Sequence, residues 1–421
     1  MMRNYLEEIR SKGLFVSKHM DEINGKKIFL RIDTNSAVTD GKLDLNSYKL
    51  FAHSENLRKY VDEGALPIIV THQGRRGDDE FVQNLEPIAR KMEELSGVKI
   101  KYVNQITGER IRKSIRDLKP GEALMIKNIR DHPHETELEV LYPCHEKCTR
   151  CDRLNEMVKS PITQFYQSEI NTFVNDGLSV CHRCQLSVVA LSQLMPIYYG
   201  LTVESELKSL QGIIDSLISG EEVTFFVGGK KFEKIKYLEK ILEYPGTRFF
   251  TGGLVGQYIA HADGLKINEK NRKLLEESEI EIAKTLLNKF RDKITYPVDF
   301  VLDDRSVVDR EGLQSCNGIV MDIGQETLDV YSKSINKRCV FAGVMGVFER
   351  GFDNTLKLLR LAAGPNTVDL GGHSSAALFQ NHGIFTYFTN RGGKVLTAGG
   401  AALALLAGER MPGLEAGLSK K

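Results

Sequence analysis

Short apolar runs of strand length alternate along the whole chain with longer stretches in which apolar residues recur at helical spacing. The expected strands are rich in β-branched or aromatic residues and lie at 27–33, 66–72, 98–103, 123–129 and 172–176 in the first half, and at 222–227, 248–251, 299–303, 318–323, 340–342, 367–370 and 395–397 in the second. Strands that alternate with helices are typical of βα units and parallel sheets. Both halves are therefore predicted to be α/β with mainly parallel sheets.

One long helix is predicted between the two halves. Apolar side chains recur near helical spacing across residues 201–219, and no flexible Gly/Ser linker interrupts them. A chain of 421 residues is too long for one compact core, so two domains are expected. We place a first domain at 1–198, a second at 199–402 and a carboxyl-terminal segment at 403–421.

The charge balance excludes several classes of function. With 57 basic and 56 acidic residues, no overall field attracts the chain to nucleic acid or to an anionic membrane. Residues 1–13 are charged and lack the apolar stretch of a signal peptide, and no window resembles a membrane span. We therefore expect a cytoplasmic protein without a nucleic-acid or membrane partner, in which any anion site is local.

Glycine pairs follow four expected strands of the second half, and each pair precedes an expected helix: Gly228-Gly229, Gly252-Gly253, Gly371-Gly372 and Gly399-Gly400. Glycines at such turns let backbone N–H groups approach a phosphate, and the helix N-terminus adds a favourable dipole. Lys230 and Lys231, directly after the first pair, offer ammonium groups that neutralise phosphates. The pattern predicts a nucleotide triphosphate site, although each pair alone is also explained as a tight turn.

Polar and cationic residues follow the expected strands of the first half: Arg31, Asp33, Asn35, His72, Arg75, Arg76, Arg130 and Arg183. Cations that converge from several strand ends would bind a multiply charged anion, such as a phosphorylated carboxylic acid. Taken singly, each of these residues is better explained as a solvated surface charge. Their repeated position beyond strands favours a site.

These turns resemble phosphoglycerate kinases of the archaeal type, in the same order along nearly the whole chain. The matching segments are Arg31-Ile32-Asp33-Thr34-Asn35, His72-Gln73-Gly74-Arg75, Asn128-Ile129-Arg130, Asn175-Asp176 with His182-Arg183, Gly228-Gly229-Lys230-Lys231, Thr251-Gly252-Gly253-Leu254-Val255, Gly346-Val347-Phe348-Glu349, Gly371-Gly372-His373-Ser374 and Leu406-Ala407-Gly408-Glu409. The resemblance implies two Rossmann-like three-layer domains that are joined by the long helix and face each other across a cleft.

The resemblance also implies reversible phosphoryl transfer between ATP or ADP, with Mg²⁺, and the carboxylate of 3-phosphoglycerate. The first domain would hold the acceptor through Arg31, Asp33, Asn35, His72, Arg75, Arg130 and Arg183. The second would hold the nucleotide through Gly228, Gly229, Lys231, Gly252, Gly253, Glu349, Gly371, Gly372, His373 and Ser374. Lys49, Arg31 and Lys231 would serve the transfer itself, and the carboxyl-terminal segment would pack back on the first domain. We expect a monomer.

Several positions depart from the family pattern. Lys49 stands where the family has an arginine beside the transferring phosphoryl group, and losing one preorganised donor costs about 10²- to 10³-fold in rate. Ala37 and Val344 replace prolines, and Leu370 and Ala398 replace the first glycines of two Gly-Gly-Gly turns. The alternative to a kinase is thus a divergent paralogue with another carboxylate substrate or weakened catalysis.

Five of the seven cysteines fall in two short stretches of the first domain: Cys144, Cys148 and Cys151 in one, and Cys181 and Cys184 in the other. Thiolates at these spacings, with His145 and His182 beside them, suit Zn²⁺ or an iron–sulfur cluster in a structural or regulatory role. The alternative is that the first group is an exposed loop and the second consists of core cysteines.

Overall fold

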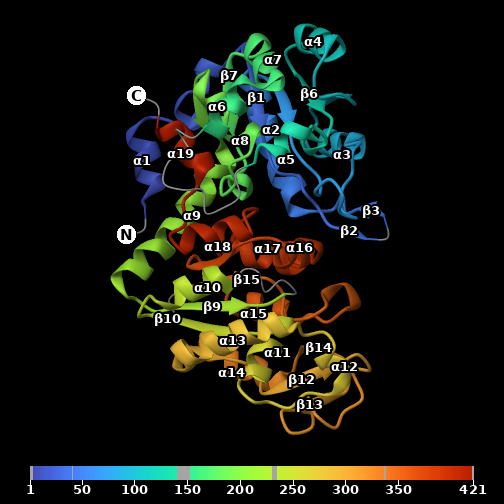
Figure 1. Cartoon of the computed structure of the whole chain (residues 1–421), viewed down its shortest axis with the longest axis vertical. Helices are drawn as coiled ribbons and strands as arrows, with labels where there is room; N and C mark the ends of the chain where they lie inside the picture. The colour runs from blue at the N-terminus through green and yellow to red at the C-terminus, as the bar shows by residue number, and fades with distance from the viewer. Residues whose placement is uncertain (1–2, 40, 140–151, 230–234, 336–337, 420–421) are drawn as a thin grey trace. The chain divides into compact units, whose positions relative to one another are not determined.

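The computed structural model describes residues 3–39, 41–139, 152–229, 235–335 and 338–419. The chain divides into two compact units (Figure 1). The amino-terminal unit consists of Arg3–Lys208 together with Glu409–Lys421, and the carboxyl-terminal unit is Ser209–Gly408. The division falls inside helix α9, Leu201–Ser219, whose bounds are those predicted from its apolar spacing. Among the described helices, none has both the length and the apolar character that a membrane crossing requires.

The amino-terminal unit is built on a six-stranded sheet in the order β5-β6-β4-β1-β7-β8, with every pair parallel. Its strands are β1 (Lys27–Arg31), β4 (Leu66–Val70), β5 (Lys99–Val103), β6 (Glu122–Ile126), β7 (Thr172–Asn175) and β8 (Ile197–Tyr199), beside a small hairpin of β2 (Val38–Thr39) and β3 (Lys42–Leu43). The helices are α1 (Tyr5–Ser11), α2 (Tyr48–Asp62), α3 (Glu86–Ser96), α4 (Glu109–Arg116), α5 (Pro133–Glu137), α6 (Asp152–Lys159), α7 (Pro161–Glu169), α8 (Leu186–Val189) and α19 (Pro412–Leu418). Strands β4 and β7 are buried at every position, so both faces of the sheet are covered.

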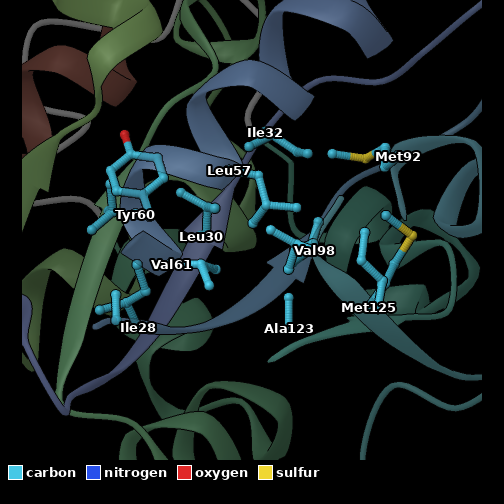
Figure 2. Packing of buried hydrophobic residues seen from close by; sticks show 14 of the residues in the cluster. Ile28, Leu30, Ile32, Leu57, Tyr60, Val61, Met92, Val98, Ala123 and Met125 are labelled. Atoms are coloured by element: carbon cyan, nitrogen blue, oxygen red, sulfur yellow. The ribbon is translucent and has the colours of Figure 1, made fainter. Parts of the chain in front are cut away.

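The core of this unit forms where β1 meets helices α2 and α3. Figure 2 shows Ile28 and Leu30 of β1 beside Leu57 and Tyr60 of α2, all of them almost completely buried. Met92 of α3 belongs to the same cluster (Figure 2). Burying side chains of this size stabilises a fold by about 1.5–3 kcal/mol each. This packing fixes β1 and therefore the turn that follows it.

Helix α19 packs within the amino-terminal unit although it comes from the end of the chain. The Tyr5 hydroxyl donates to Glu415 Oε1 at 2.9 Å, and Gly413 N donates to the carbonyl oxygen of Cys181 at 2.8 Å. A Cβ on Gly413 would lie 2.8 Å from Cys181 Cα, so the close approach requires glycine. The end of the chain is thereby attached next to the turn after β7.

The carboxyl-terminal unit has a second six-stranded parallel sheet in the order β11-β10-β9-β15-β16-β17. Its strands are β9 (Val223–Val227), β10 (Thr247–Thr251), β11 (Ile294–Thr295), β15 (Cys339–Ala342), β16 (Thr367–Asp369) and β17 (Lys394–Val395). The helices are α10 (Ile235–Leu242), α11 (Gly253–Ala262), α12 (Glu269–Arg272), α13 (Glu277–Phe290), α14 (Gln325–Ser332), α15 (Asn354–Leu361), α16 (His373–Gln380), α17 (His382–Asn390) and α18 (Gly400–Leu406). Both predicted α/β folds with mainly parallel sheets are confirmed.

Two of the predicted strands of this unit lie outside the parallel sheet. Strands β12 (Asp299–Leu302) and β14 (Val320–Ile323) pair antiparallel, and together with β13 (Val307–Asp309) they form a separate three-stranded sheet. Local apolar patterns identify a strand but not its partner, which explains the difference.

Candidate functional site

In the amino-terminal unit, the predicted anion-binding residues follow four adjacent strands, β6, β4, β1 and β7. Arg31 is the last residue of β1 and is completely buried. Its Nε donates to Ser187 Oγ at 3.0 Å and its Nη2 donates to His72 Nδ1 at 3.3 Å. Burial lowers the pKa of His72 well below its usual value, and the charge of Arg130 adds to the effect. His72 is therefore a neutral imidazole that accepts from Arg31.

Asp33 lies two residues beyond β1 and is almost completely buried. Lys49 Nζ, from helix α2, lies 2.5 Å from Asp33 Oδ2, and Ser179 Oγ donates to the same oxygen at 2.6 Å. Burial acts to raise the pKa of Asp33, but the Lys49 ammonium opposes it and holds that pKa well below its usual value. The carboxylate is ionised, and the backbone N–H of Asn35 donates to its Oδ1 at 2.9 Å.

Asn35, Gly74 and Arg130 link three turns of the same edge. Gly74 N donates to Asn35 Oδ1 at 2.7 Å, and Arg130 Nη1 donates to the carbonyl oxygen of Gly74 at 2.8 Å. Gly74 has a φ of +63°, and a Cβ there would collide with the backbone of Glu80, so only glycine fits. The turn thus presents a buried guanidinium to the carboxyl edge of the sheet.

Arg130 is only 5% exposed, and its Nε has no hydrogen-bond partner among the described residues. Burial lowers the pKa of Arg130 to about 10, with further lowering by the nearby charges of Arg183 and Arg31. The group remains cationic at neutral pH. A buried cation with an unused donor is the strongest indication of an anion site in this unit.

Arg75 and Arg183 lie nearer the surface, with side chains 45% and 29% exposed. Both face the carboxylate of Glu139: Arg183 Nη1 lies 3.1 Å from Oε1, and Arg75 Nη2 lies 3.9 Å from Oε2. Of the residues predicted to hold the acceptor, direct contacts join Arg31 to His72 and Asn35 to Asp33, whereas Arg75 and Arg183 share only Glu139.

Sequence reasoning missed three polar residues of this site: Glu135, Ser187 and Ser179. Glu135 is completely buried and accepts from the Ser187 hydroxyl at 2.6 Å and from its backbone N–H at 2.9 Å. Burial raises the pKa of Glu135, and the charge of Arg31 opposes that rise. Glu135 is thus the counter-charge of Arg31 through Ser187. Glu135 and Ser187 are 52 positions apart, so no local pattern indicates their contact.

In the carboxyl-terminal unit, the first two glycine pairs lie at the carboxyl ends of neighbouring strands. Gly228 and Gly229 follow β9, and Gly252 and Gly253 follow β10 and begin α11. Gly252 N donates to the carbonyl oxygen of Val227 at 2.9 Å. A Cβ on Gly228 would collide with the carbonyl oxygen of Val344, and one on Gly252 would lie 2.6 Å from the Met345 side chain. Packing of the loop after β15 therefore requires both glycines.

The other two pairs follow β16 and β17. Gly371 and Gly372 have positive φ values of 104° and 85°, and Gly372 caps α16. Gly399 has a φ of 52° and caps α18. Ser374 Oγ donates to Asp369 Oδ1 at 2.5 Å, while His373 at the start of α16 is exposed. Glu349 is exposed in the turn Phe348–Arg350, and Lys231 lies outside the described residues.

The departures from glycine do not fill the turns with side chains. Leu370 and Ala398 are buried, with 1% and 3% exposed. Arg305 is the only non-glycine among the described residues with a positive φ, so Leu370, Ala398 and Val344 all have ordinary backbone conformations. Because the side chains of Leu370 and Ala398 are buried, replacing the two glycines leaves no exposed side chain at these positions.

The structure does not support the metal hypothesis at the second cysteine group. Cys181 is buried, donates to the carbonyl oxygen of Gly177 at 3.4 Å and accepts from Asn175 Nδ2 at 3.5 Å. Burial raises the pKa of Cys181 to about 12, so the thiol stays protonated. Cys144, Cys148 and Cys151 lie outside the described residues. Within the described part of the chain, no group of three or more His, Cys, Asp or Glu residues has the arrangement of a metal site.

Two parallel six-stranded sheets, one with cationic turns and the other with glycine turns beyond its strands, define an α/β protein of the class that binds anionic small molecules at strand ends. A family model described as phosphoglycerate kinase matches residues 18–409. The chain therefore belongs to the phosphoglycerate kinase family.

Individual relatives agree with this assignment. The chain is 32% identical to phosphoglycerate kinase 1 of Methanosarcina acetivorans over 94% of this chain and 93% of that protein. It is 31% identical to phosphoglycerate kinase of Methanopyrus kandleri over 94% and 95% of the two chains. The crystal structure of phosphoglycerate kinase from Pyrococcus horikoshii matches with a TM-score of 0.81 at 29% identity, covering 94% of this chain and 96% of that one.

Proposed function

We propose that the protein catalyses reversible phosphoryl transfer between MgATP and the carboxylate of 3-phosphoglycerate. Within the chain, one observation carries the proposal: Arg130 is a buried cation whose Nε has no partner among the described residues, and Arg31 is a second buried cation near it. Arg31 already has Glu135 as its counter-charge, whereas Arg130 keeps an unpaired buried donor among the described residues, which is costly. A small, multiply charged anion is the partner that such a site requires, and a phosphorylated carboxylic acid has that charge.

The acceptor is held by groups of different chemistry. Arg130, Arg75 and Arg183 bind its charged oxygens, because guanidinium groups match phosphate and carboxylate geometry. Asp33 Oδ2 accepts hydrogen bonds from Lys49 and Ser179, whereas Oδ1 accepts one from the Asn35 N–H. The remaining lone pair on Oδ1 accepts a hydroxyl proton of the acceptor. This combination selects a phosphorylated hydroxy acid over a simple phosphate.

The nucleotide is held in the carboxyl-terminal unit by the glycine turns together with Lys231, His373, Ser374 and Glu349. Backbone N–H groups at these turns approach the phosphates closely because no Cβ intervenes. Mg²⁺ enters with the nucleotide as MgATP and keeps phosphate oxygens and water as most of its ligands.

Transfer requires little covalent chemistry from the protein. In-line phosphoryl transfer is accelerated mainly by positioning and by neutralising charge on the transferring group. Arg31, Lys49 and Lys231 supply that charge, and Lys49 supplies it without the rigid fork of an arginine. We further propose an acceptor domain at 1–198, a nucleotide domain at 199–402 and a carboxyl-terminal segment at 403–421 that packs on the first domain.

In this proposal, the protein acts as a monomer in the cytoplasm on small-molecule substrates, with no nucleic-acid or membrane partner. No observation on the described residues favours Zn²⁺ or an iron–sulfur cluster, nor the divergent paralogue with weakened catalysis. A metal role is therefore not part of the proposal.

The test is a coupled assay that follows ADP formation from ATP, Mg²⁺ and 3-phosphoglycerate. We expect turnover that depends on all three components and falls at least 10²-fold in Arg130→Met. Glycerate, which lacks the phosphate, serves as the control acceptor. Equal rates with 3-phosphoglycerate and glycerate would refute the assignment of the arginines to the acceptor.

A further inference from the structure

Glu139 carries the carboxylate that faces the two least buried arginines of the anion site. Its side chain is only 6% exposed, and its partners among the described residues are Arg183 at 3.1 Å and Arg75 at 3.9 Å. Neither a backbone N–H nor a hydroxyl group of the described chain donates to its carboxylate in the contacts recorded for it. Among the described residues, the carboxylate is thus contacted by Arg183 and, at longer range, by Arg75.

Glu139 differs in this respect from the other two acids of the site. Glu135 receives both the hydroxyl and the backbone N–H of Ser187. Asp33 receives Lys49, Ser179 and a backbone N–H. Those carboxylates are held by several donors that belong to the fold, whereas Glu139 uses the same type of donor that an anionic ligand would use.

We propose that Glu139 is an internal anion which occupies Arg183 and lies beside Arg75 in the unliganded protein, and which the anionic acceptor displaces. The inference rests on the proposed function, because it takes the two arginines as ligands of that acceptor. A carboxylate oxygen and a phosphate oxygen make the same charge-assisted bond to a guanidinium, so both cannot use the same donor hydrogens. Binding of the acceptor therefore includes the free energy of releasing Glu139 to water.

The exposure of the two arginines determines how strongly Glu139 can weaken acceptor binding. Arg75 and Arg183 are 45% and 29% exposed, so their pairing with Glu139 is partly screened by solvent. Although the Glu139 carboxylate is buried, screening of the arginines keeps the pairing weak enough to be displaced, and removing one competitor of that strength changes a dissociation constant about two- to five-fold. A completely buried pair would be too strong for this role.

A positioning role for Glu139 predicts the opposite change in acceptor affinity. If Glu139 held the arginines in their binding orientation, removing its charge would weaken acceptor binding. The contact geometry favours displacement, because the Arg75–Glu139 distance of 3.9 Å is too long for a hydrogen bond and fixes Arg75 poorly.

The experiment compares Glu139→Gln with Glu137→Gln in the full-length chain. Glu137 is exposed at the end of α5 and makes none of these contacts, so it controls for the loss of one negative charge in the segment. Titration calorimetry measures the dissociation constants of 3-phosphoglycerate and of inorganic sulfate at low ionic strength. We expect two- to five-fold tighter binding of both anions to Glu139→Gln, a smaller gain at high salt, and no change in Glu137→Gln.

A double-mutant cycle shows whether the tighter anion binding of Glu139→Gln depends on Arg183. In an Arg183→Gln background, Glu139→Gln should tighten binding by less than two-fold, because the shared donor is gone. Unchanged or weaker binding of both anions to Glu139→Gln would overturn the inference. If the unmodified chain bound sulfate but not 3-phosphoglycerate, the proposed function would fail instead, and the sulfate titrations would still decide the role of Glu139.

Discussion

Replacing Lys49 by methionine tests how the site keeps an ionised carboxylate inside the fold. Lys49 Nζ lies 2.5 Å from Asp33 Oδ2, and their side chains are 19% and 3% exposed. Methionine retains most of the side-chain volume and removes the ammonium, with its charge and its hydrogen bond to Asp33. Breaking a buried ion pair by removing one partner costs about 3–5 kcal/mol, because the other charge is left without compensation.

We expect the lower end of that range, about 3 kcal/mol, because Lys49 retains some contact with water and Ser179 still donates to Asp33. The pKa of Asp33 is held below its usual value in the folded chain, so the stabilisation is present above the unfolded carboxyl pKa and is lost as the pH falls through the folded one. In Lys49→Met burial remains, so the pKa of Asp33 rises. The deficit should therefore be largest near pH 8 and shrink towards pH 5, where the variant protonates Asp33.

Hydrogen exchange of β1 and β7 amides, measured from pH 5 to 8, is the appropriate assay, because the two units can unfold separately and a global transition would mix them. Lys59→Met is the matched control, since Lys59 lies on the exposed side of the same helix and its ammonium donates to Asn56 Oδ1. A deficit below 1 kcal/mol, or one that does not change with pH, would refute the reasoning about the Lys49–Asp33 pair.

Two further substitutions separate the turns from the packing beneath them. Gly74→Ala forces a side chain against the Glu80 backbone at a positive φ, so we expect acceptor affinity to fall at least ten-fold while nucleotide affinity stays unchanged. Titration calorimetry with each ligand measures both affinities. Equal losses of affinity for the two ligands would contradict this expectation. Leu370→Ala removes a buried side chain and should cost about 2–5 kcal/mol of stability, which hydrogen exchange of the β16 amides measures. Nucleotide affinity should not improve. Tighter nucleotide binding would show that Leu370 obstructs the turn.

The sequence predicts the fold well wherever a local pattern is sufficient. The helix at 201–219 was bounded correctly because its apolar spacing runs unbroken, and β1 and β4 begin where their apolar runs begin. The strands were expected to run two residues too far, to Asp33 and His72, because polar residues that leave the ladder still continue the extended chain.

Partners that are distant along the chain were not predictable in the same way. Strand β8 has only three residues and was missed, and the antiparallel pairing of β12 with β14 depends on tertiary packing. Within the site, the turn residues were predicted from their position after strands. Glu135 and Ser187 were missed because a buried acid is recognisable only once the arginine that it balances has been located.

We propose that the cationic turns of the amino-terminal unit bind a phosphorylated carboxylic acid, which then receives a phosphoryl group from MgATP. The most direct measurement is the steady-state rate of ADP formation with saturating MgATP as the 3-phosphoglycerate concentration is varied. We expect saturable turnover that Arg130→Met reduces at least 10²-fold. An ADP-forming rate that is independent of 3-phosphoglycerate and unaffected by Arg130→Met would contradict it.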